Sequence, residues 1–485
     1  MSCEILYTDI LIIGSGPGGS VIGDCLKDSN KKIIMVEQGL DANNDLDVKK
    51  NIYDPIFKYY NNGGAIPVFS SPIFPFAEAK VLGGGSEING GLIWKTPKHI
   101  LDYWLLNNFI SKDLYDIVDE LYEKVSDDLR VNYDSSKLKG NNDSLLIDKA
   151  AKRHNLLSVD VPKAISNCKL HNRCSSICPS AQKNSLSKTL LKGIRDKVQI
   201  LSGLKVIKLK KKNSYIDYCY VKNIKTNQII KIFSKFYFLS TGSISTPFLL
   251  SKSNILKKNN SLMFHHNLRF IVDYKKNINA SHGTMFNKQI QEYIEDRFLI
   301  MASNFRKSFF ANALESKDNE LNLRISRYKE HALYTTQVQT FGKGSVKNFF
   351  NQSPLITFKF NEKDNELIKS AIKSTVKLLF QSDAKQIILP IKNNYLINSY
   401  EEYIESIHNN YTIKDVELLS VHAMSSVPMS LDSNSPVNEY GRLRVVDNLF
   451  ISDASILPTN IGESPQGTIM IFANYIANKF KKKYL

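Results

Sequence analysis

Residues 8–39, TDILIIGSGPGGSVIGDCLKDSNKKIIMVEQG, carry the pattern that decides the fold. A short apolar run, Ile10 to Ile13, is typical of a buried parallel strand, and it leads directly into a glycine-rich turn. Apolar residues at helical spacing follow from Val21 to Leu26, and a second apolar run ends at Glu37. This order predicts a dinucleotide-binding strand–helix–strand unit, with Glu37 placed to accept hydrogen bonds from ribose hydroxyls.

The turn between the first strand and the helix holds five residues that fit a bound pyrophosphate. They are Gly14, Gly16, Pro17, Gly18 and Gly19. Gly14 permits the tight turn, Gly16 lets the backbone approach the phosphates, and Gly19 allows the helix to pack closely on the strand. The phosphates are expected at the positive N-terminal end of the helix. The turn alone does not separate FAD from NAD.

The composition is that of a globular protein. The chain has 485 residues, of which 42% are hydrophobic and 23% charged, so it is long enough for two domains. No apolar run is long enough to span a bilayer, and the first residues lack the basic and small-residue features of a signal peptide. Six cysteines in a chain of this length do not indicate a secreted disulfide scaffold. We therefore expect a cytoplasmic protein without a transmembrane segment.

The formal net charge of +17 has two interpretations. A nucleic-acid-binding protein concentrates basic residues on one face, often with arginine and interleaved aromatic residues. In this chain the lysines are spread throughout, and asparagine and isoleucine are abundant as well, which favours a general compositional bias. We expect no nucleic-acid partner; the alternative, a polyanion-binding protein, requires binding that weakens steeply with salt.

A second glycine cluster lies in residues 79–97, AKVLGGGSEINGGLIWKTP. Its candidate binding residues are Gly84, Ser86, Asn89 and Gly90. So many glycines bring the backbone very close to something flat or charged, and Asn89 adds a side-chain amide among them. The apolar residues that follow argue against a plain surface loop.

Four segments together resemble the glucose–methanol–choline family of FAD oxidoreductases. They occur in the family's order and at plausible spacings, and the stretch of about 265–410 carries no matching motif. The segments are the N-terminal fingerprint, GGGSEINGG at 83–91, LSTGSISTPFLLSKSNI at 239–255, and the C-terminal motifs HAMSSVPM at 422–429 and DNLFISDASILPTNIGESPQGTIMIFANYIA at 447–477.

The resemblance implies an α/β protein, α+β overall, with a Rossmann-like FAD-binding domain that is discontinuous in sequence. A second, substrate-binding domain is expected on an antiparallel sheet with flanking helices. The expected FAD-binding domain comprises 1–100, 195–265 and 415–485, and the substrate domain 101–194 and 266–414. The residues themselves predict successive strands with short turns over 198–242.

The resemblance also implies cofactor contacts. Val206 falls where the family's backbone contacts adenine, and Asp453 and Ala454 fall near the flavin's phosphate and ring end. Pro465 and Gln466 are further candidate cofactor-binding residues. Some members attach FAD covalently through a histidine just before the motif asparagine, where this chain has Ile88. We therefore expect FAD to be bound non-covalently.

Oxidation of an alcohol by a flavin needs a group that removes the hydroxyl proton while hydride leaves carbon for flavin N5. His422 matches the family's histidine at the reactive face of the flavin, so the resemblance makes it the general base. Histidine suits this task because its ordinary pKa lies near 6.5. The expected substrate is an alcohol or a sugar-like molecule; the electron acceptor, oxygen or a redox partner, leaves no signature in the sequence.

The second catalytic position departs from the family. A histidine or asparagine usually stands there, whereas this chain has Ser464, followed by the family-like Pro465. Three interpretations follow. Ser464 contacts the substrate through a water in place of the usual second catalytic group, or Glu463 or Gln466 takes over that role. In the third, the chemistry is altered or lost. The last alternative corresponds to a flavin-binding scaffold or partner subunit. We expect a working enzyme, because the helix after Pro465 keeps its motif.

Three cysteines lie close together in sequence: Cys168, Cys174 and Cys178. Their spacing is unusual for an iron–sulfur cluster or a zinc site, even with His171 as a fourth ligand. A structural thiol cluster is preferred over a metal site or a redox disulfide, so no metal is expected. His265 and His266 are interpreted as structural residues.

Overall fold

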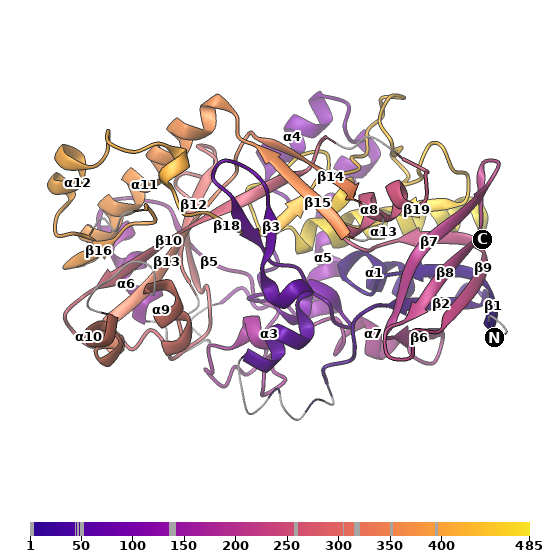
Figure 1. Ribbon diagram of the computed structural model, residues 1–485, viewed down its shortest axis with the longest axis horizontal. Helices are drawn as coiled ribbons and strands as arrows, with labels where there is room; N and C mark the ends of the chain where they lie inside the picture. Colours follow the sequence, from indigo (N-terminus) through magenta and orange to yellow (C-terminus); the bar gives the residue numbers. More distant parts are fainter. Residues whose placement is uncertain are drawn as a thin grey trace.

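The computed structural model describes residues 4–43, 45, 48, 53–134, 142–256, 260–303, 305–314, 321–349, 353–392 and 396–485. Figure 1 shows two lobes, each built around a β-sheet, with both chain ends in the lobe that contains β1. Helices α1 (Pro17–Leu26), α5 (Lys112–Leu129) and α13 (Gln466–Tyr484) lie between the first sheet and the rest of the molecule. The arrangement is the mixed α/β fold with two domains that the sequence predicts.

The first sheet has seven strands in the described residues, in the order β6-β2-β1-β9-β8-β7, and β19 pairs with the end of β9. The four strands β6, β2, β1 and β9 run parallel, whereas β8 and β7 are antiparallel additions. This confirms the predicted strand–helix–strand unit and the successive strands after residue 198. The strands are β1 (Glu4–Ile13), β2 (Ile33–Glu37), β6 (Val198–Ser202), β7 (Leu204–Lys212), β8 (Tyr215–Asn223), β9 (Ile229–Leu239) and β19 (Leu449–Ile451).

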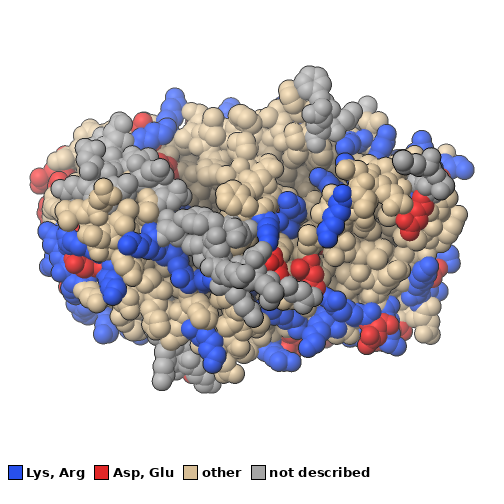
Figure 2. Space-filling model, turned by 60° about the horizontal axis from the view of Figure 1, so that its bottom comes forward, with Lys and Arg blue, Asp and Glu red and all other residues tan. Residues whose placement is uncertain are grey.

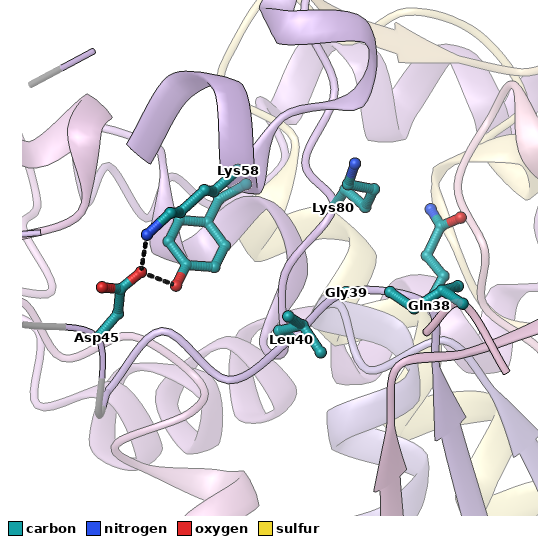
Figure 3. Close-up of a pocket in the computed structure, with 8 residues that line it drawn as sticks. Gln38, Gly39, Leu40, Asp45, Lys58 and Lys80 are labelled. Carbon is teal, nitrogen blue, oxygen red and sulfur yellow. Dashed lines mark hydrogen bonds and ion pairs between the residues drawn. The ribbon is translucent and has the colours of Figure 1, made fainter. Parts of the chain in front are cut away.

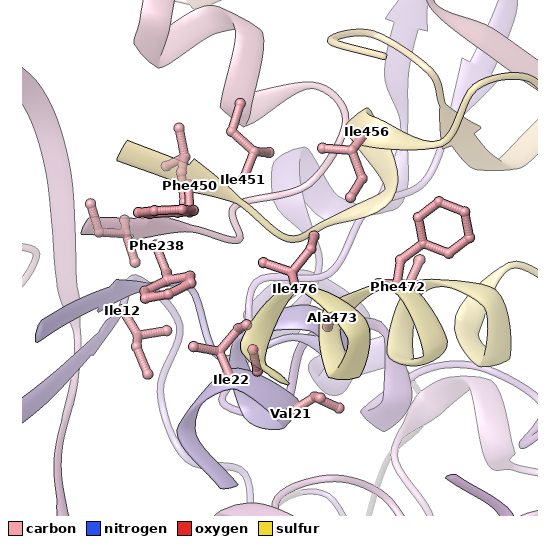
Figure 4. Close-up of a cluster of buried hydrophobic side chains, with 14 of the residues drawn as sticks. Ile12, Val21, Ile22, Phe238, Phe450, Ile451, Ile456, Phe472, Ala473 and Ile476 are labelled. Atoms are coloured by element: carbon pink, nitrogen blue, oxygen red, sulfur yellow. The ribbon is translucent and has the colours of Figure 1, made fainter. Parts of the chain in front are cut away.

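The core of the first lobe forms where α1 (Pro17–Leu26) and α13 (Gln466–Tyr484) pack against the sheet. Residues of α13 are buried from its start to Ala477, because its sequence there is apolar on all sides. Figure 4 shows Ile476 of α13, Ile22 of α1 and Phe238 of β9 in one buried cluster. The last helix therefore belongs to the same core as the first strand.

The second sheet has ten strands in the described residues, in the order β3-β4-β18-β10-β13-β12-β11-β5, with β16 and β17 attached to β10. Among the described residues, all strand pairs in this sheet are antiparallel except β18 with β4. This is the antiparallel sheet predicted for the substrate domain. Its strands are β3 (Ile66–Val68), β4 (Phe74–Phe76), β5 (Ser158–Asp160), β10 (Met263–Asp273), β11 (Lys288–Ile290), β12 (Phe298–Ala302), β13 (His331–Val338), β16 (Gln386–Ile388), β17 (Leu396–Ile397) and β18 (Leu419–Met424).

Helices cover this second sheet and a separate hairpin lies beside it. Helix α11 (Glu362–Gln381) begins at a capping box. The Asn361 side chain accepts a hydrogen bond from the Lys363 N–H, and the Asp364 carboxylate accepts one from the Asn361 N–H, which accounts for the start of the helix at residue 362. The hairpin is β14 (Lys343–Phe349) with β15 (Ser353–Lys359). The remaining helices are α3 (Tyr53–Tyr59), α4 (Lys98–Leu106), α5 (Lys112–Leu129), α6 (Asn142–Arg153), α7 (Leu190–Gly193), α8 (Ser245–Lys252), α9 (Lys307–Leu314), α10 (Leu321–Ser326), α11 (Glu362–Gln381) and α12 (Tyr400–Ser406).

The chain crosses between the two sheets several times. The first sheet takes its strands from 4–37, 198–239 and 449–451, all inside the ranges expected for the FAD-binding domain. Strands β4 and β18 also lie inside those ranges but pair within the second sheet. The exact bounds of the two domains stay a prediction. Among the described helices none is long and apolar enough to cross a lipid bilayer.

Candidate active site

The glycine turn after β1 is held by close contacts with two distant segments. A Cβ added to Gly14 would lie 2.3 Å from the Ser240 carbonyl oxygen, and one added to Gly18 would lie 1.5 Å from that of Ser452. Gly14 also has a φ of +100°, which favours glycine. These two glycines are therefore required by packing of the turn against the ends of β9 and β19.

Gly16 differs from its neighbours because open space lies in front of it. The nearest atom to a Cβ added there is the Gly84 Cα, at 4.0 Å. Gly16 caps α1 without a side-chain hydrogen bond, and Pro17 occupies the first helical position. An uncapped helix N-terminus with open space beside it fits an anionic phosphate group. Gly19, by contrast, lies against the Gly14 carbonyl, with an added Cβ at 2.0 Å, as expected for close helix–strand packing.

Glu37, at the end of β2, stabilises this turn through hydrogen bonds. Its Oε2 accepts hydrogen bonds from the Ser15 N–H at 3.0 Å and the Ser15 hydroxyl at 2.8 Å, and its Oε1 accepts one from the Gly39 N–H at 2.7 Å. Burial raises the pKa of Glu37, although the three hydrogen bonds oppose the shift. The predicted contact with a ribose stays a prediction.

A cavity of about 310 Å³ opens just beyond Glu37. In Figure 3 Gln38, Gly39 and Leu40 line one side of it, and Lys58 contacts Asp45 on the other. The Asp45 carboxylate also accepts a hydrogen bond from the Tyr59 hydroxyl at 2.6 Å. The size of the cavity, and its position next to Glu37 at the end of the dinucleotide fingerprint, suit the adenosine end of a cofactor.

Val206 does not line this cavity in the described residues. It lies on β7 opposite Val221 and packs against the core of the first lobe, whereas Ile224, just after β8, lines the cavity. The predicted adenine contact concerns the Val206 backbone and stays a prediction.

The second glycine cluster contacts the first. A Cβ on Gly84 would lie 2.7 Å from the Gly16 Cα, and the Gly83 N–H donates to the Ser15 hydroxyl at 3.0 Å. Ser86 fixes this loop from within, since its hydroxyl donates to the Gly83 carbonyl at 2.8 Å and accepts from the Leu186 N–H at 3.0 Å. The two glycine-rich loops therefore form one continuous backbone surface.

Asn89 and Gly90 end this surface. The Asn89 side-chain amide donates to Gln466 Oε1 at 2.5 Å, so it connects the loop to the first turn of α13. Gly90 packs against Phe286, where an added Cβ would lie 2.5 Å from the ring. Ile88, in the position that would carry a covalent flavin link, is partly buried and packs against Val81 and its neighbours.

Asp453 ties the C-terminal segment to the start of α8. Its Oδ2 accepts hydrogen bonds from the Gly242 N–H at 2.8 Å and the Thr246 hydroxyl at 2.5 Å, and its Oδ1 accepts one from the Ser455 N–H at 2.8 Å. Ala454 is buried beside it, and its carbonyl accepts from the Ser425 N–H. Three protein groups thus hold the Asp453 carboxylate in place, and its predicted contact with a cofactor stays a prediction.

Glu78 is a residue that the sequence analysis did not single out. Burial, the largest cause, together with nearby Asp453 and Glu37 raises the pKa of Glu78 to about 7. Its Oε2 accepts from the Asn61 amide at 2.7 Å, and its Oε1 lies 3.2 Å from a Cβ added to Gly242. Three carboxyl groups therefore surround the candidate dinucleotide site. No local sequence motif marks Glu78, because its position depends on the fold.

The His422 imidazole faces His265 on the neighbouring strand. The two Nδ1 atoms are 3.2 Å apart, and the ring planes are nearly perpendicular, at 86°. The Gly462 N–H donates to His265 Nε2 at 3.0 Å. Because a backbone N–H can only donate, neutral His265 carries its proton on Nδ1 and donates it to His422 Nδ1. Neutral His422 then has its own proton on Nε2.

Burial keeps both imidazoles neutral. It lowers the pKa of His422 to about 4 and that of His265 well below 6.5, with His422 and His266 adding to the second shift. His265 is therefore part of the site, although the sequence analysis treats it as structural. His266 bonds the Thr340 hydroxyl instead, at 3.0 Å, and burial lowers its pKa to about 3.

The loop before α13 passes over the second sheet beside this pair. Ser464 is mostly buried, and no described residue forms a hydrogen bond with its hydroxyl. Glu463 is directed toward β11, and its Oε1 accepts from the side-chain amides of Gln289 in that strand and of Gln291 just after it. Burial raises the pKa of Glu463 to about 8 despite those bonds. Pro465 caps α13. The first turn of this helix lies so close to the segment at Trp94 that a Cβ added to Gly467 would be 2.1 Å from the Trp94 carbonyl oxygen.

The cysteine segment lies under the second glycine loop. Cys168, Cys174 and Cys178 are free thiols, and the Cys168 sulfur accepts hydrogen bonds from the Thr284 hydroxyl and the Leu170 N–H. In the part of the chain that is described, no group of three or more His, Cys, Asp or Glu side chains could hold a metal ion.

Comparison with known proteins finds one family in two long parts of the chain. Models of the GMC oxidoreductase family match residues 56–271 and residues 350–473, the latter with the family's C-terminal domain. An uncharacterized GMC-type oxidoreductase of Sinorhizobium fredii is 24% identical over 97% of this chain and 94% of its own length. A long-chain-alcohol oxidase of Arabidopsis thaliana is 23% identical over 98% of this chain and 68% of its own.

Solved structures share the fold over the full length. Pyridoxine 4-oxidase from Mesorbium loti superposes with a TM-score of 0.74 at 15% identity, covering 100% of both chains. Formate oxidase superposes with a TM-score of 0.71 at 14% identity, covering 100% of this chain and 99% of its own.

Proposed function

Because the chain belongs to the GMC oxidoreductase family, we propose that it binds FAD non-covalently and uses it to oxidise a CH–OH group, with His422 taking the hydroxyl proton. The observation that carries this proposal is the joint surface of two glycine-rich loops, ending at Asn89, together with the His422–His265 pair. When bound, FAD supplies the acceptor for the hydride that leaves the substrate carbon.

The residues present fit an FAD molecule. The open space at Gly16 and the uncapped N-terminus of α1 suit the pyrophosphate, and the cavity beyond Glu37 suits the adenosine. Ile88 offers no nucleophile for a covalent link, which supports a dissociable cofactor. The bounds 1–100, 195–265 and 415–485 remain our proposal for the FAD-binding domain.

The base role of His422 sets a requirement on its tautomer. Nε2 can accept the hydroxyl proton only if the proton of neutral His422 lies on Nδ1, so that His265 has to accept a hydrogen bond at its own Nδ1. His265 then carries its proton on Nε2, and its bond with the Gly462 N–H must break. While that bond persists, His422 is instead a donor to the substrate oxygen. The substrate or the flavin has to displace Gly462 for base action.

Ser464 is our candidate for the second group at the substrate. Its hydroxyl is free of partners among the described residues, whereas Glu463 and Gln466 already bond β11 and Asn89. A serine is shorter than the asparagine or histidine of the family, so a water between it and the substrate oxygen completes the contact.

The proposed substrate is a small-molecule alcohol or a sugar-like compound, and the proposed setting is the cytoplasm. Figure 2 shows lysine and arginine spread over the face in view and interspersed with acidic residues, which supports a general basic composition over a nucleic-acid site. The free thiols among the described residues agree with a reducing compartment.

The test is anaerobic reduction of the FAD-loaded protein. Purified chain is mixed with long-chain alcohols, pyridoxine and formate, the compounds named for its relatives, and with short primary alcohols. Loss of the visible flavin absorption with at least one alcohol is expected. A flavin that stays oxidised with every compound would support a flavin-binding scaffold, and a chain that takes up no FAD would refute the proposal.

A further inference from the structure

Two lysines are buried beneath the second glycine loop. Lys163 is 0% exposed and Lys183 is 2% exposed. Lysine is almost never fully buried unless its ammonium is paired, because removal of the charge from water costs several kcal/mol, on the order of the whole stability margin. Neither ammonium forms an ion pair with a carboxylate of the described residues. Strong local interactions must therefore hold both ammonium groups in place.

Backbone carbonyls, mainly those of the glycine loop, surround the two ammonium groups. Lys183 Nζ donates to the carbonyl oxygens of Glu87 at 2.7 Å, Asn89 at 3.0 Å and Cys174 at 2.9 Å. Lys163 Nζ donates to those of Gly90 at 2.7 Å and Met285 at 2.5 Å. Three of the five carbonyls lie between residues 87 and 90.

The bond from Lys183 to the Asn89 carbonyl fixes the direction of the Gly90 N–H. In a trans peptide the C=O and N–H point in opposite directions. The Asn89 carbonyl is held by Lys183, so the Gly90 N–H points away from it, and it has no acceptor among the described residues. The ammonium charge also polarises that peptide, which makes its N–H a better donor.

A second chain of bonds runs from Lys163 to the Asn89 side chain. Lys163 holds the Gly90 carbonyl, and the N–H of the same peptide, on Gly91, donates to Asn89 Oδ1 at 3.0 Å. The Asn89 amide then donates to Gln466 at the start of α13. Lys163 thus orients the side chain at the end of the loop surface.

No carboxylate bonds either ammonium group directly among the described residues. Burial is the main cause that lowers the pKa of both lysines, that of Lys163 to about 8; nearby thiols oppose this shift for both, and Glu87 opposes it for Lys183. The Cys174 thiol is buried, and burial raises its pKa, so it stays neutral. The Glu87 carboxylate accepts from the Ser187 N–H and not from Lys183.

We propose that Lys163 and Lys183 are positioning residues that hold the loop with the Gly90 N–H directed toward the flavin and, through their positive charge, raise the flavin's reduction potential. This rests on the proposed FAD function. A reduced flavin carries more negative charge than the oxidised one, so a fixed cation in a poorly solvated region stabilises the reduced form. Each lysine thereby makes acceptance of the hydride more favourable.

The test measures the flavin reduction potential of variants that change charge and hydrogen bonding separately. Lys183→Gln keeps a donor for the carbonyls without the charge, and Lys183→Met and Lys163→Met remove both. Lys192→Met, at an exposed position of α7, is the control. Bound FAD per chain is measured first, and the potential is then measured by equilibration with a reference dye.

Each neutral variant is expected to bind FAD and to lower the equilibrium constant for reduction about tenfold, which is about 30 mV for a two-electron couple. Lys192→Met is expected to keep the wild-type potential, since its charge is screened by solvent. A wild-type potential in Lys183→Gln or Lys163→Met would overturn the proposal.

Folding failures are also decisive. If the neutral variants are insoluble or lose FAD while Lys183→Arg and Lys163→Arg keep the wild-type potential, the charge serves loop folding alone and the proposal fails. Failure of the FAD function itself looks different, since the wild-type chain would then bind no flavin.

Discussion

His265 and His422 lie opposite each other on the neighbouring strands β10 and β18, with their Nδ1 atoms 3.2 Å apart. One strand register therefore decides which nitrogen of the candidate base carries a proton. Since His265 also bonds Gly462, the loop that leads into α13 is coupled to the same proton. The site joins an imidazole from each of two strands with a backbone amide near the end of the chain.

Replacement of His422 by alanine is expected to slow flavin reduction by the substrate about 100-fold or more, the usual contribution of a general base. In the wild type, reduction is expected to persist down to about pH 4, because burial lowers the pKa of His422 to about 4 and a base must be neutral. Stopped-flow absorbance across pH measures both. His154→Ala, at an exposed position, is the control; near-normal reduction by His422→Ala would exclude it from the mechanism.

Replacement of His265 by leucine is expected to slow flavin reduction about tenfold, because the protonated His422 loses the acceptor at its Nδ1. His265→Gln should retain most of the rate, since a carboxamide offers both a donor and an acceptor. Nitrogen NMR of the unliganded wild type should show the His422 proton on Nε2. Equal rates for the leucine variant and the wild type would make His265 a packing residue only.

Gly16→Ala is expected to yield a folded chain that binds FAD about 100-fold more weakly. The added methyl meets no protein atom closer than 4.0 Å, so it fits the protein but fills the space assigned to phosphate. The loss corresponds to two hydrogen bonds to a charged group, about 1.5 kcal/mol each. Fluorescence titration with FAD measures it. Gly193→Ala, which also meets no atom within 4 Å, is the matched control, and unchanged affinity for Gly16→Ala would move the phosphates elsewhere.

Glu78→Gln is expected to strengthen FAD binding above pH 7 and to leave it nearly unchanged below. The pKa of Glu78 is raised to about 7, so the wild-type carboxyl becomes a third negative charge near the phosphates as pH rises through that value. One such charge is worth on the order of 1 kcal/mol, or about fivefold in affinity. The exposed Glu120→Gln is the control. A wild-type affinity that is constant across pH 7 would contradict this placement.

Glu463→Gln is expected to remove a pH dependence of stability. The pKa of Glu463 is raised from 4.5 to about 8 by burial, so the folded chain holds a proton that the unfolded chain releases. Wild-type stability relative to the variant is full below pH 4.5 and falls as pH rises to about 8, by up to about 1.4 kcal/mol per unit. Thermal unfolding of both proteins over this range measures it. Parallel curves would mean that Glu463 titrates normally.

Local sequence patterns predicted the first strand–helix–strand unit because each of its features is set by nearby residues. The apolar run before Gly14 and the acid at Glu37 need no long-range information. The role of each glycine was harder to assign. Gly18 is required because the Ser452 carbonyl lies against it, a contact between residues that no local pattern relates.

The residues that were missed depend on tertiary contacts. His265 enters the site through strand pairing with β18, and Glu78 through its approach to Gly242 and Asp453. Lys163 and Lys183 read as ordinary surface lysines in a basic chain, and only their burial under a loop seventy or more residues earlier distinguishes them. Their partners are carbonyl oxygens, which every residue has, so the sequence carries no sign of the contact.

The contact of Gly18 with Ser452 also has a consequence for biosynthesis. During translation the turn assigned to phosphate, at residues 14–19, is made long before residue 452, whose carbonyl lies against it. Until then the turn lacks its backing, and the first strand lacks the helix that shares its core. The proposed FAD site is therefore complete only after residue 452 has been translated, and a product that stops earlier lacks the backing of this turn.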